Sequence, residues 1–123
     1  MKITCAPLLT ILLAFAVNAE TTNLRCIYKS YSNMQGNHKD SLELNFIIDN
    51  EAQESYLLGN NGSAKVVKIN GAEGITFIEV TGAGNVMMTA ITSESLDSVH
   101  SRHSILMGKM IPSQYYGRCE IRN

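Results

Sequence analysis

The sequence predicts an all-β domain, a small antiparallel meander of about eight strands that forms either a barrel or a two-sheet sandwich. Three observations predict this fold class. Apolar residues alternate with polar ones or form short runs, and no helical stripe of any length is present. Clusters of Gly and Asn interrupt the runs at near-regular spacing. Two cysteines, Cys26 and Cys119, lie near the two ends of the domain.

The clearest predicted strand covers residues 41–49, in which every second side chain is apolar. Its apolar face consists of Leu42, Leu44, Phe46 and Ile48. Further strands are expected at residues 24–31, 54–58, 64–69, 75–81, 86–92, 99–107 and 110–121. Short Gly- and Asn-rich turns join neighbouring antiparallel strands. Residues 36–40 are expected to form a solvated loop with His38 on the surface, and the last strand is expected to begin after Pro112 or to lie at an edge there.

Residues 1–19 have the features of a secretory signal peptide. Lys2 supplies a short positive start, the apolar stretch that follows is too short to span a bilayer, and Val17 and Ala19 are small residues at a cleavage site. We expect cleavage after Ala19, with residues 20–123 forming a single β domain and no membrane span remaining. The mature protein is expected in the periplasm or secreted.

An exported chain enters an oxidising compartment, where a lone cysteine pair normally forms a disulfide. Cys5 is lost with the signal peptide, so Cys26 and Cys119 allow one connectivity. The bond closes almost the whole mature chain into a loop, which chain entropy values at about 4 to 5 kcal/mol. It also fits barrel closure, because the first and last strands must become neighbours. The alternative, two free thiols with a redox role, lacks a Cys-x-x-Cys spacing.

Charge excludes some partners. The chain has 10 Lys and Arg against 11 Asp and Glu, and loss of Lys2 with the signal peptide takes the formal charge from −1 to −2. A near-neutral chain without a basic run is not expected to bind nucleic acid or an anionic membrane as its main partner.

The segment from Ser98 to Ser104 departs from alternation, because it places charged or polar side chains on both faces of a strand. It contains His100, Arg102 and His103. Local departures of this kind often mark functional sites. The alternative is an edge strand or solvated loop whose charges prevent further pairing.

A second candidate follows on the next predicted strand, where Tyr116 and Arg118 lie opposite the Cys119 face. Tyr and Arg are favoured at protein recognition sites. If that face is exposed, we expect His100, Arg102, Tyr116 and Arg118 to form one outward, positive and aromatic patch. The alternative is that Tyr116 makes ordinary cross-strand packing.

Neither a metal site, a cofactor nor catalysis is expected. His100 and His103 are three residues apart, so on a regular strand they point to opposite faces and do not converge on a metal. No Gly-x-Ser-x-Gly elbow accompanies Ser101 or Ser104, and no pair of carboxylates converges as an acid and a base.

With a signal peptide, about a hundred mature residues and one disulfide near the ends, the chain resembles small periplasmic β-barrel proteins of the lysozyme-inhibitor type. The resemblance is architectural over residues 24–121 and assigns no site residues. The lack of a catalytic constellation and the Tyr and Arg residues near the C-terminus predict a non-catalytic binding or inhibitory protein that acts on a protein partner. The alternative is a small-ligand or lipid carrier, whose interior lining would use the flexible side chains of Met87, Met88, Met107 and Met110.

Overall fold

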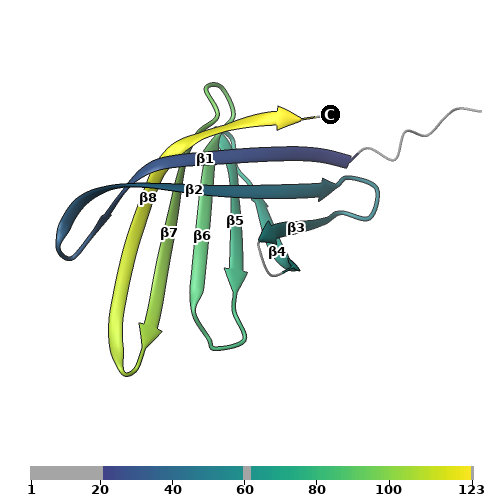
Figure 1. Ribbon diagram of the computed structural model, residues 1–123. Helices are drawn as coiled ribbons and strands as arrows, with labels where there is room; N and C mark the ends of the chain where they lie inside the picture. Colours follow the sequence, from purple (N-terminus) through teal and green to yellow (C-terminus); the bar gives the residue numbers. More distant parts are fainter. Residues whose placement is uncertain (1–20, 60–61, 123) are drawn as a thin grey trace, which may run out of the picture.

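The computed structural model describes residues 21–59 and 62–122, and over these residues the chain forms antiparallel strands and no helix. The strands are β1 (Thr21–Asn33), β2 (Gly36–Asp49), β3 (Glu54–Gly59), β4 (Gly62–Asn70), β5 (Gly74–Val80), β6 (Val86–Thr92), β7 (Asp97–Leu106) and β8 (Lys109–Arg122). Each strand pairs with the next, and β8 pairs with β1, so the sheet closes into a barrel (Figure 1). The predicted all-β class is confirmed as an eight-stranded barrel. The predicted signal peptide, residues 1–19, lies outside the described residues.

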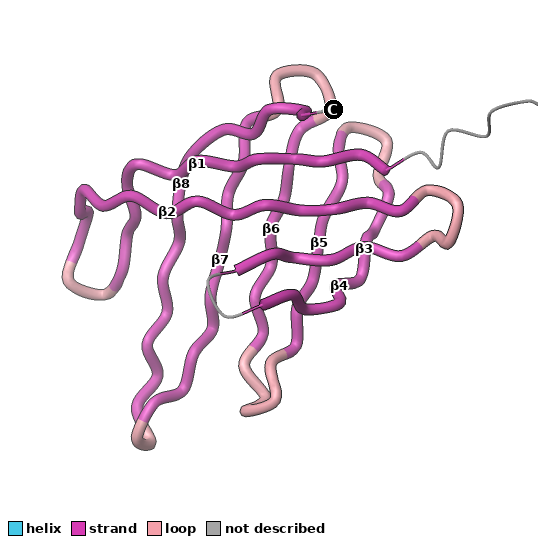
Figure 2. The backbone as a smooth tube through the Cα atoms, turned by 45° about the vertical axis from the view of Figure 1, so that its right-hand side comes forward, coloured by secondary structure: helices cyan, strands magenta, loops and turns pink. Residues whose placement is uncertain are grey.

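The barrel is flattened into two crossing layers. In Figure 2, β1 to β4 run across the view while β5 to β8 run behind them. Gly117, in the middle of β8, pairs with Tyr28 of β1 and with Ser98 of β7. A Cβ atom at Gly117 would lie 2.0 Å from the backbone oxygen of Ile27, so only glycine permits this approach of β1 and β8. A bulge in β1 between Tyr28 and Ser30 adds to the local bend.

The core follows from the alternation predicted for the strands. Its buried residues are Leu24, Cys26, Tyr28, Leu44, Phe46, Ile48, Leu57, Val66, Phe77, Ile91 and Cys119. Phe46 of β2 and Phe77 of β5 stack across the barrel with their ring centroids 4.3 Å apart. These rings fill the space between the two layers.

The predicted disulfide is confirmed. Cys26 and Cys119 lie directly opposite each other in the β1–β8 pairing, and their sulfur atoms are bonded. Both residues are buried. The bond therefore joins the first strand to the last at the closure of the barrel, and it is compatible with an exported protein.

Two local expectations need correction. Residues 36–40, expected to be a loop, are the first part of β2, because β1 continues to Asn33 and pairs with them. His38 is consequently half-buried, and its ring stacks on Tyr31 at 4.9 Å. Pro112 does not precede β8 but lies within it, opposite His103. Its neighbour Ser113 forms the final pair between β8 and β1, so Pro112 lies just beyond the β1–β8 ladder. The expectation that the strand lies at an edge at Pro112 is therefore confirmed, whereas the expectation that it begins after Pro112 is wrong.

Candidate functional site

The hairpin formed by β7 and β8 carries all five residues that the sequence suggests for binding. Its turn consists of Met107 and Gly108, since Leu106 pairs with Lys109. A two-residue turn pairs even-numbered residues of β7 with odd-numbered residues of β8, so His100 is opposite Tyr115. His100 and Arg102 therefore share the interior face with Tyr115 and Cys119, whereas Tyr116 and Arg118 share the outer face.

The expected single outward patch of four residues is therefore wrong. His100 is only 1% exposed and Arg102 is half-buried, while Tyr116 and Arg118 are exposed. The reason is the length of the turn. Because a two-residue turn pairs even-numbered residues of β7 with odd-numbered residues of β8, His100 and Tyr116 lie on opposite faces of the hairpin. His103 is exposed on the outer face, opposite Pro112.

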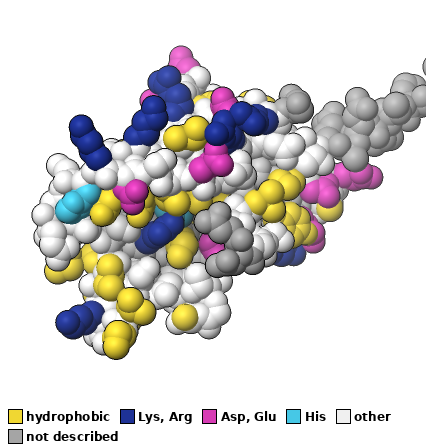
Figure 3. Space-filling model, in the orientation of Figure 1, with side chains coloured by type: hydrophobic (Ala, Val, Ile, Leu, Met, Phe, Trp, Pro, Cys, Tyr) yellow, Lys and Arg dark blue, Asp and Glu magenta, His cyan; other side chains and the backbone are white. Residues whose placement is uncertain are grey.

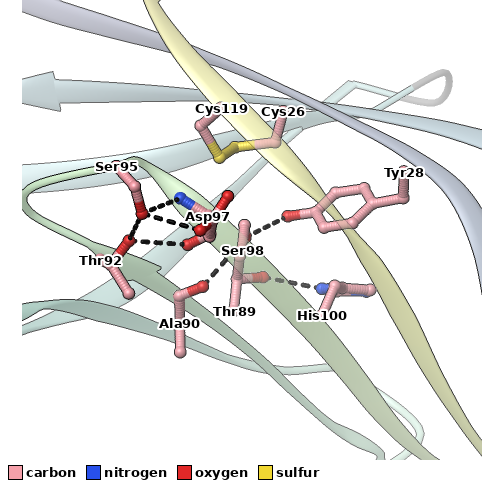
Figure 4. The surroundings of a disulfide bond; sticks show 10 residues. All are labelled: Cys26, Tyr28, Thr89, Ala90, Thr92, Ser95, Asp97, Ser98, His100 and Cys119. Carbon is pink, nitrogen blue, oxygen red and sulfur yellow. Dashed lines mark hydrogen bonds between the residues drawn. A yellow bond between two sulfur atoms is a disulfide. The ribbon is translucent and has the colours of Figure 1, made fainter.

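Inside the barrel, β6, β7 and β1 contribute a polar cluster, which consists of Tyr28, Thr89, Ser98, His100 and Arg102. Figure 4 shows Tyr28 directed at Ser98, and Thr89 directed at His100. Ser98 Oγ donates to the carbonyl of Ala90 at 2.9 Å, so the Tyr28 hydroxyl donates to Ser98 Oγ at 2.8 Å. Burial raises the pKa of Tyr28 to about 12.

His100 is held in one tautomer by its two neighbours. Arg102 Nε donates to His100 Nε2 at 3.1 Å, so this nitrogen carries no proton. His100 Nδ1 therefore carries the proton and donates to Thr89 Oγ1 at 2.7 Å. Burial and, to a smaller extent, the positive charge of Arg102 together lower the pKa of His100 from 6.5 to about 4. The imidazole is thus neutral at neutral pH.

Every buried side-chain nitrogen and oxygen among the described residues has a hydrogen-bond partner. The polar cluster is thus internally satisfied, as buried polar groups normally are. Within the described ranges no three His, Cys, Asp or Glu side chains gather as a metal site would require. His100 and His103 lie on opposite faces of β7.

On the outer face, Tyr116 stands between two hollows. One, of about 510 Å³, is lined by Thr76 and Ala90 as well as Val99, which is opposite Tyr116. The small side chain of Ala90 leaves this part of the wall recessed. The other hollow, of about 450 Å³, includes Arg25 and lies over β1 and β8. The Tyr116 hydroxyl is bonded to Ser32 Oγ at 2.8 Å.

Arg118 is less available than its exposure suggests. Its Nε lies 3.2 Å from Asp97 Oδ1, and the two residues are opposite each other on β8 and β7. A hydrogen bond from Ser95 and, after it, the contact with Arg118 lower the pKa of Asp97. Arg118 therefore contributes an already neutralised charge to the rim of the outer face.

The end of the β7–β8 hairpin is apolar. We call residues 105–111 the hairpin tip; its exposed apolar residues are Ile105, Leu106, Met107, Met110 and Ile111. Figure 1 shows that the β7–β8 and β5–β6 hairpins both extend below β1 to β4, with the β7–β8 hairpin reaching slightly further, and Figure 3 shows hydrophobic side chains gathered at that lower end. Met107 is 93% exposed. The signal in the sequence is two apolar runs on either side of Gly108, which break the alternation that a strand with one solvent face requires.

The hairpin tip continues onto the outer wall of β5 and β6. Val80 is opposite Val86, which is opposite His103, two residues from the tip. Met88 is the next outward-facing residue of β6 after Val86, and it is opposite Ile78 of β5. We use the name outer wall for the following outward-facing residues of β5 to β8: Thr76, Ile78, Val80, Val86, Met88, Ala90, Val99 and Tyr116.

Three of the four methionines expected to line an interior lie on the outside of the barrel. Met88, Met107 and Met110 are exposed on the outside of the barrel, whereas Met87 is half-buried. The expectation that these residues form an adaptable internal lining is therefore wrong for three of the four. Alternation places Met88 outward because Thr89, its neighbour, points to His100.

Comparison with known proteins adds no relative: no family model, no curated protein and no solved structure matches this chain. The candidate sites therefore rest on the geometry of the barrel itself.

Proposed function

We propose that the chain is an exported, non-catalytic binding protein that holds a protein partner on the hairpin tip and the adjoining outer wall. One observation carries this proposal: apolar side chains are exposed together at the end of a projecting hairpin. Exposed apolar patches that continue over neighbouring strands commonly mark interaction sites. The tip and outer wall also contain methionine and tyrosine, which are enriched at protein interfaces.

The geometry of the turn supports the same proposal. Met107 has a φ of 52° and Gly108 a φ of 75°, the combination found in type I′ turns. Asn, Asp or Gly normally occupies the first of these positions, because other side chains are strained there. Met107 is therefore both strained and exposed, which stabilises nothing within this chain. Contact with a partner gives that side chain a role.

Charge indicates the chemistry of the partner. Between Asp97 and Arg122 the hairpin has four Lys and Arg residues against two carboxylates, Asp97 and Glu120, and Lys109 is the basic residue of its tip. The whole chain has a formal charge of −1, so this hairpin is basic on an otherwise acidic protein. Complementary charge speeds encounter and selects orientation. An apolar surface surrounded by acidic residues is the partner that fits.

A protein fits this surface better than a bilayer does. The apolar residues run from the tip along the side of the barrel to Met88 and Val99, and a flat membrane reaches only a projecting end. Lys109 lies in the tip beside Met110, where insertion into hydrocarbon would carry its charge inward.

The inner groups that resemble catalytic residues are occupied by structural bonds. Ser98 Oγ donates to Ala90, and both ring nitrogens of His100 have partners. A serine nucleophile needs its hydroxyl next to a free base. This arrangement supports a binding role. The carrier alternative loses support, because Phe46 and Phe77 stack in the middle of the barrel and three methionines face outward.

Two chemically identical substitutions test the proposal. Ile105 in the tip and Ile121 near the end of β8 are 59% and 56% exposed. Wild type, Ile105→Thr and Ile121→Thr are each immobilised, and the proteins retained from the matching exported fraction are quantified. We expect one acidic protein to be retained by wild type and by Ile121→Thr, and to be reduced about tenfold or more with Ile105→Thr. Equal retention by all three baits would contradict the proposal.

A further inference from the structure

Arg102 differs from the other arginines of the described residues in its charge partners. Arg25, Arg118 and Arg122 each form an ion pair with a carboxylate. Within residues 21–59 and 62–122, no carboxylate lies within ion-pair distance of Arg102, although its side chain is half-buried on the interior face. A partly desolvated cation without a counterion is energetically costly, and a bound anion relieves that cost.

The guanidinium of Arg102 is held in a defined orientation. Its Nε is bonded to His100 Nε2 at 3.1 Å, and its central carbon lies 5.0 Å from the centroid of the Tyr115 ring. One edge and one face of the group are therefore occupied. The described residues accept no hydrogen bond from Nη1 or Nη2, so that edge remains available. Two parallel N–H groups on such an edge match the two oxygens of a carboxylate.

A row of aromatic rings begins at Tyr115 of β8 and crosses β1 to β2. Tyr31 stacks on Tyr115 with ring centroids 5.0 Å apart, and His38 stacks on the other side of Tyr31. These residues are half-buried, so part of each ring is accessible. Arg102 is opposite Ser113, which in turn is opposite Asn33. A cationic edge thus lies beside aromatic surface and a hydroxyl.

We propose that Arg102, Tyr115 and Tyr31 form a recognition site for a carboxylate attached to an apolar or aromatic group. His100 is a positioning residue, because its neutral Nε2 fixes the guanidinium and adds no second charge. One unpaired positive charge matches a monoanion, whereas a phosphate dianion would leave negative charge uncompensated. The carboxylate belongs either to a free small molecule or to an acidic side chain of a protein. The residues of this site are half-buried on the inward-facing side of β1, β7 and β8, and binding there does not depend on partner binding at the hairpin tip.

The first arm of the test uses a free carboxylate. Isotope-labelled, disulfide-bonded protein is titrated with benzoate, with the uncharged analogue benzamide and with inorganic phosphate, while the Arg102 Nε–H signal is followed by NMR. We expect a saturable shift with benzoate and none with benzamide. Phosphate binding as tightly as benzoate would overturn the monoanion assignment. Because this comparison uses the wild type alone, it stands even if a variant fails to fold.

The second arm uses a blocked acidic peptide, acetyl-Phe-Glu-amide, with acetyl-Phe-Gln-amide as its control. A saturable shift with the Glu peptide but not with benzoate supports the carboxylate site and assigns it to a protein side chain; the reverse supports it and assigns it to a free ligand. No saturable shift with either compound overturns the proposal.

Matched variants locate the site. Arg102→Lys keeps the charge but loses the paired N–H edge, and we expect it to weaken carboxylate binding about tenfold or more. Because this variant lacks the Arg102 Nε–H, binding to the variants is followed by the backbone N–H signals of Tyr31 and Tyr115. Arg118→Lys, the same change on the outer face, should leave binding unchanged. An equal effect of the two variants would overturn the assignment to Arg102. Partner retention by the tip is a separate readout, so failure of one proposal is distinguishable from failure of the other.

Discussion

Two regions of the barrel interior are built by the same alternation but contain different side chains. Around the disulfide, β1 to β5 contribute an apolar region that includes Leu24, Phe46 and Phe77. On β6 and β7, together with Tyr28 of β1, the interior contains the polar cluster instead, with His100 fully buried and Arg102 half-buried. Hydrophobic burial and loop closure account for the first region. They do not account for the second, where the cost of desolvating polar groups is offset by the hydrogen bonds within the cluster.

The largest effect is expected in the apolar region. Replacing both cysteines, Cys26→Ala with Cys119→Ala, removes the bond that closes β1 on β8. The loop that it closes spans 93 positions, so chain entropy predicts a loss of about 4 to 5 kcal/mol. Denaturant unfolding of the oxidised wild type and the double variant measures this loss. A loss below about 1 kcal/mol would show that the strands close the barrel without help from the disulfide.

The polar cluster is expected to make stability depend on pH. The folded-state pKa of His100 is depressed from 6.5 to about 4, so the unfolded chain binds more protons between these values. Its contribution to stability is complete above pH 6.5 and is lost as pH falls, with a total of about 3 kcal/mol by pH 4. Unfolding free energies measured from pH 7 to pH 4 should show this loss.

A substitution isolates the imidazole from the carboxylates that titrate at the lower end of the range. His100→Gln retains an acceptor for Arg102 and a donor for Thr89 but does not titrate, so the difference between wild type and variant gives the contribution of His100. Tyr28→Phe should keep the wild-type slope. An unchanged pH dependence in His100→Gln would show that the imidazole is not the group responsible.

A smaller effect is expected from Tyr28→Phe itself. The hydroxyl donates to Ser98 Oγ, and Ser98 still donates to Ala90 after its removal. No buried donor is left without a partner, so the cost is about 1 kcal/mol, the usual worth of one hydrogen bond. Thermal or denaturant unfolding measures it. A cost above about 3 kcal/mol would mean that the cluster acts as one cooperative unit.

Much of the fold could be predicted from the sequence. Alternation at Leu44 and Phe46 located the core face, and the positions of Cys26 and Cys119 indicated which strands meet at closure. The sequence does not predict that β1 and β2 extend to the turn at Met34 and Gln35, because the polar residues there resemble a loop. The end of β1 is held in the sheet by its pairing with β8. The two strands lie far apart in the sequence, so a local residue pattern does not reveal that they pair.

The candidate site could be predicted only in part. The sequence identifies the unusual segment with His100 and Arg102, but the expectation that these side chains face outward with Tyr116 is wrong. Counting residues across the two-residue turn would have placed them on the face opposite Tyr116. The contacts of Arg102 with His100 and Tyr115 depend on the register between β7 and β8 and on side-chain orientation. The hairpin tip is not predicted, because the pattern around Met107 and Met110 also fits residues that line an interior.

The most direct test of the binding role is a single substitution, Met107→Asn, measured in two ways. Asn tolerates the positive φ of this turn position and removes the exposed apolar side chain. We therefore expect the free energy of unfolding to stay level or rise by up to about 1 kcal/mol, while retention of the partner falls about tenfold or more. A variant that is at least as stable and still retains the partner at the wild-type level would contradict the claim that the hairpin tip binds it.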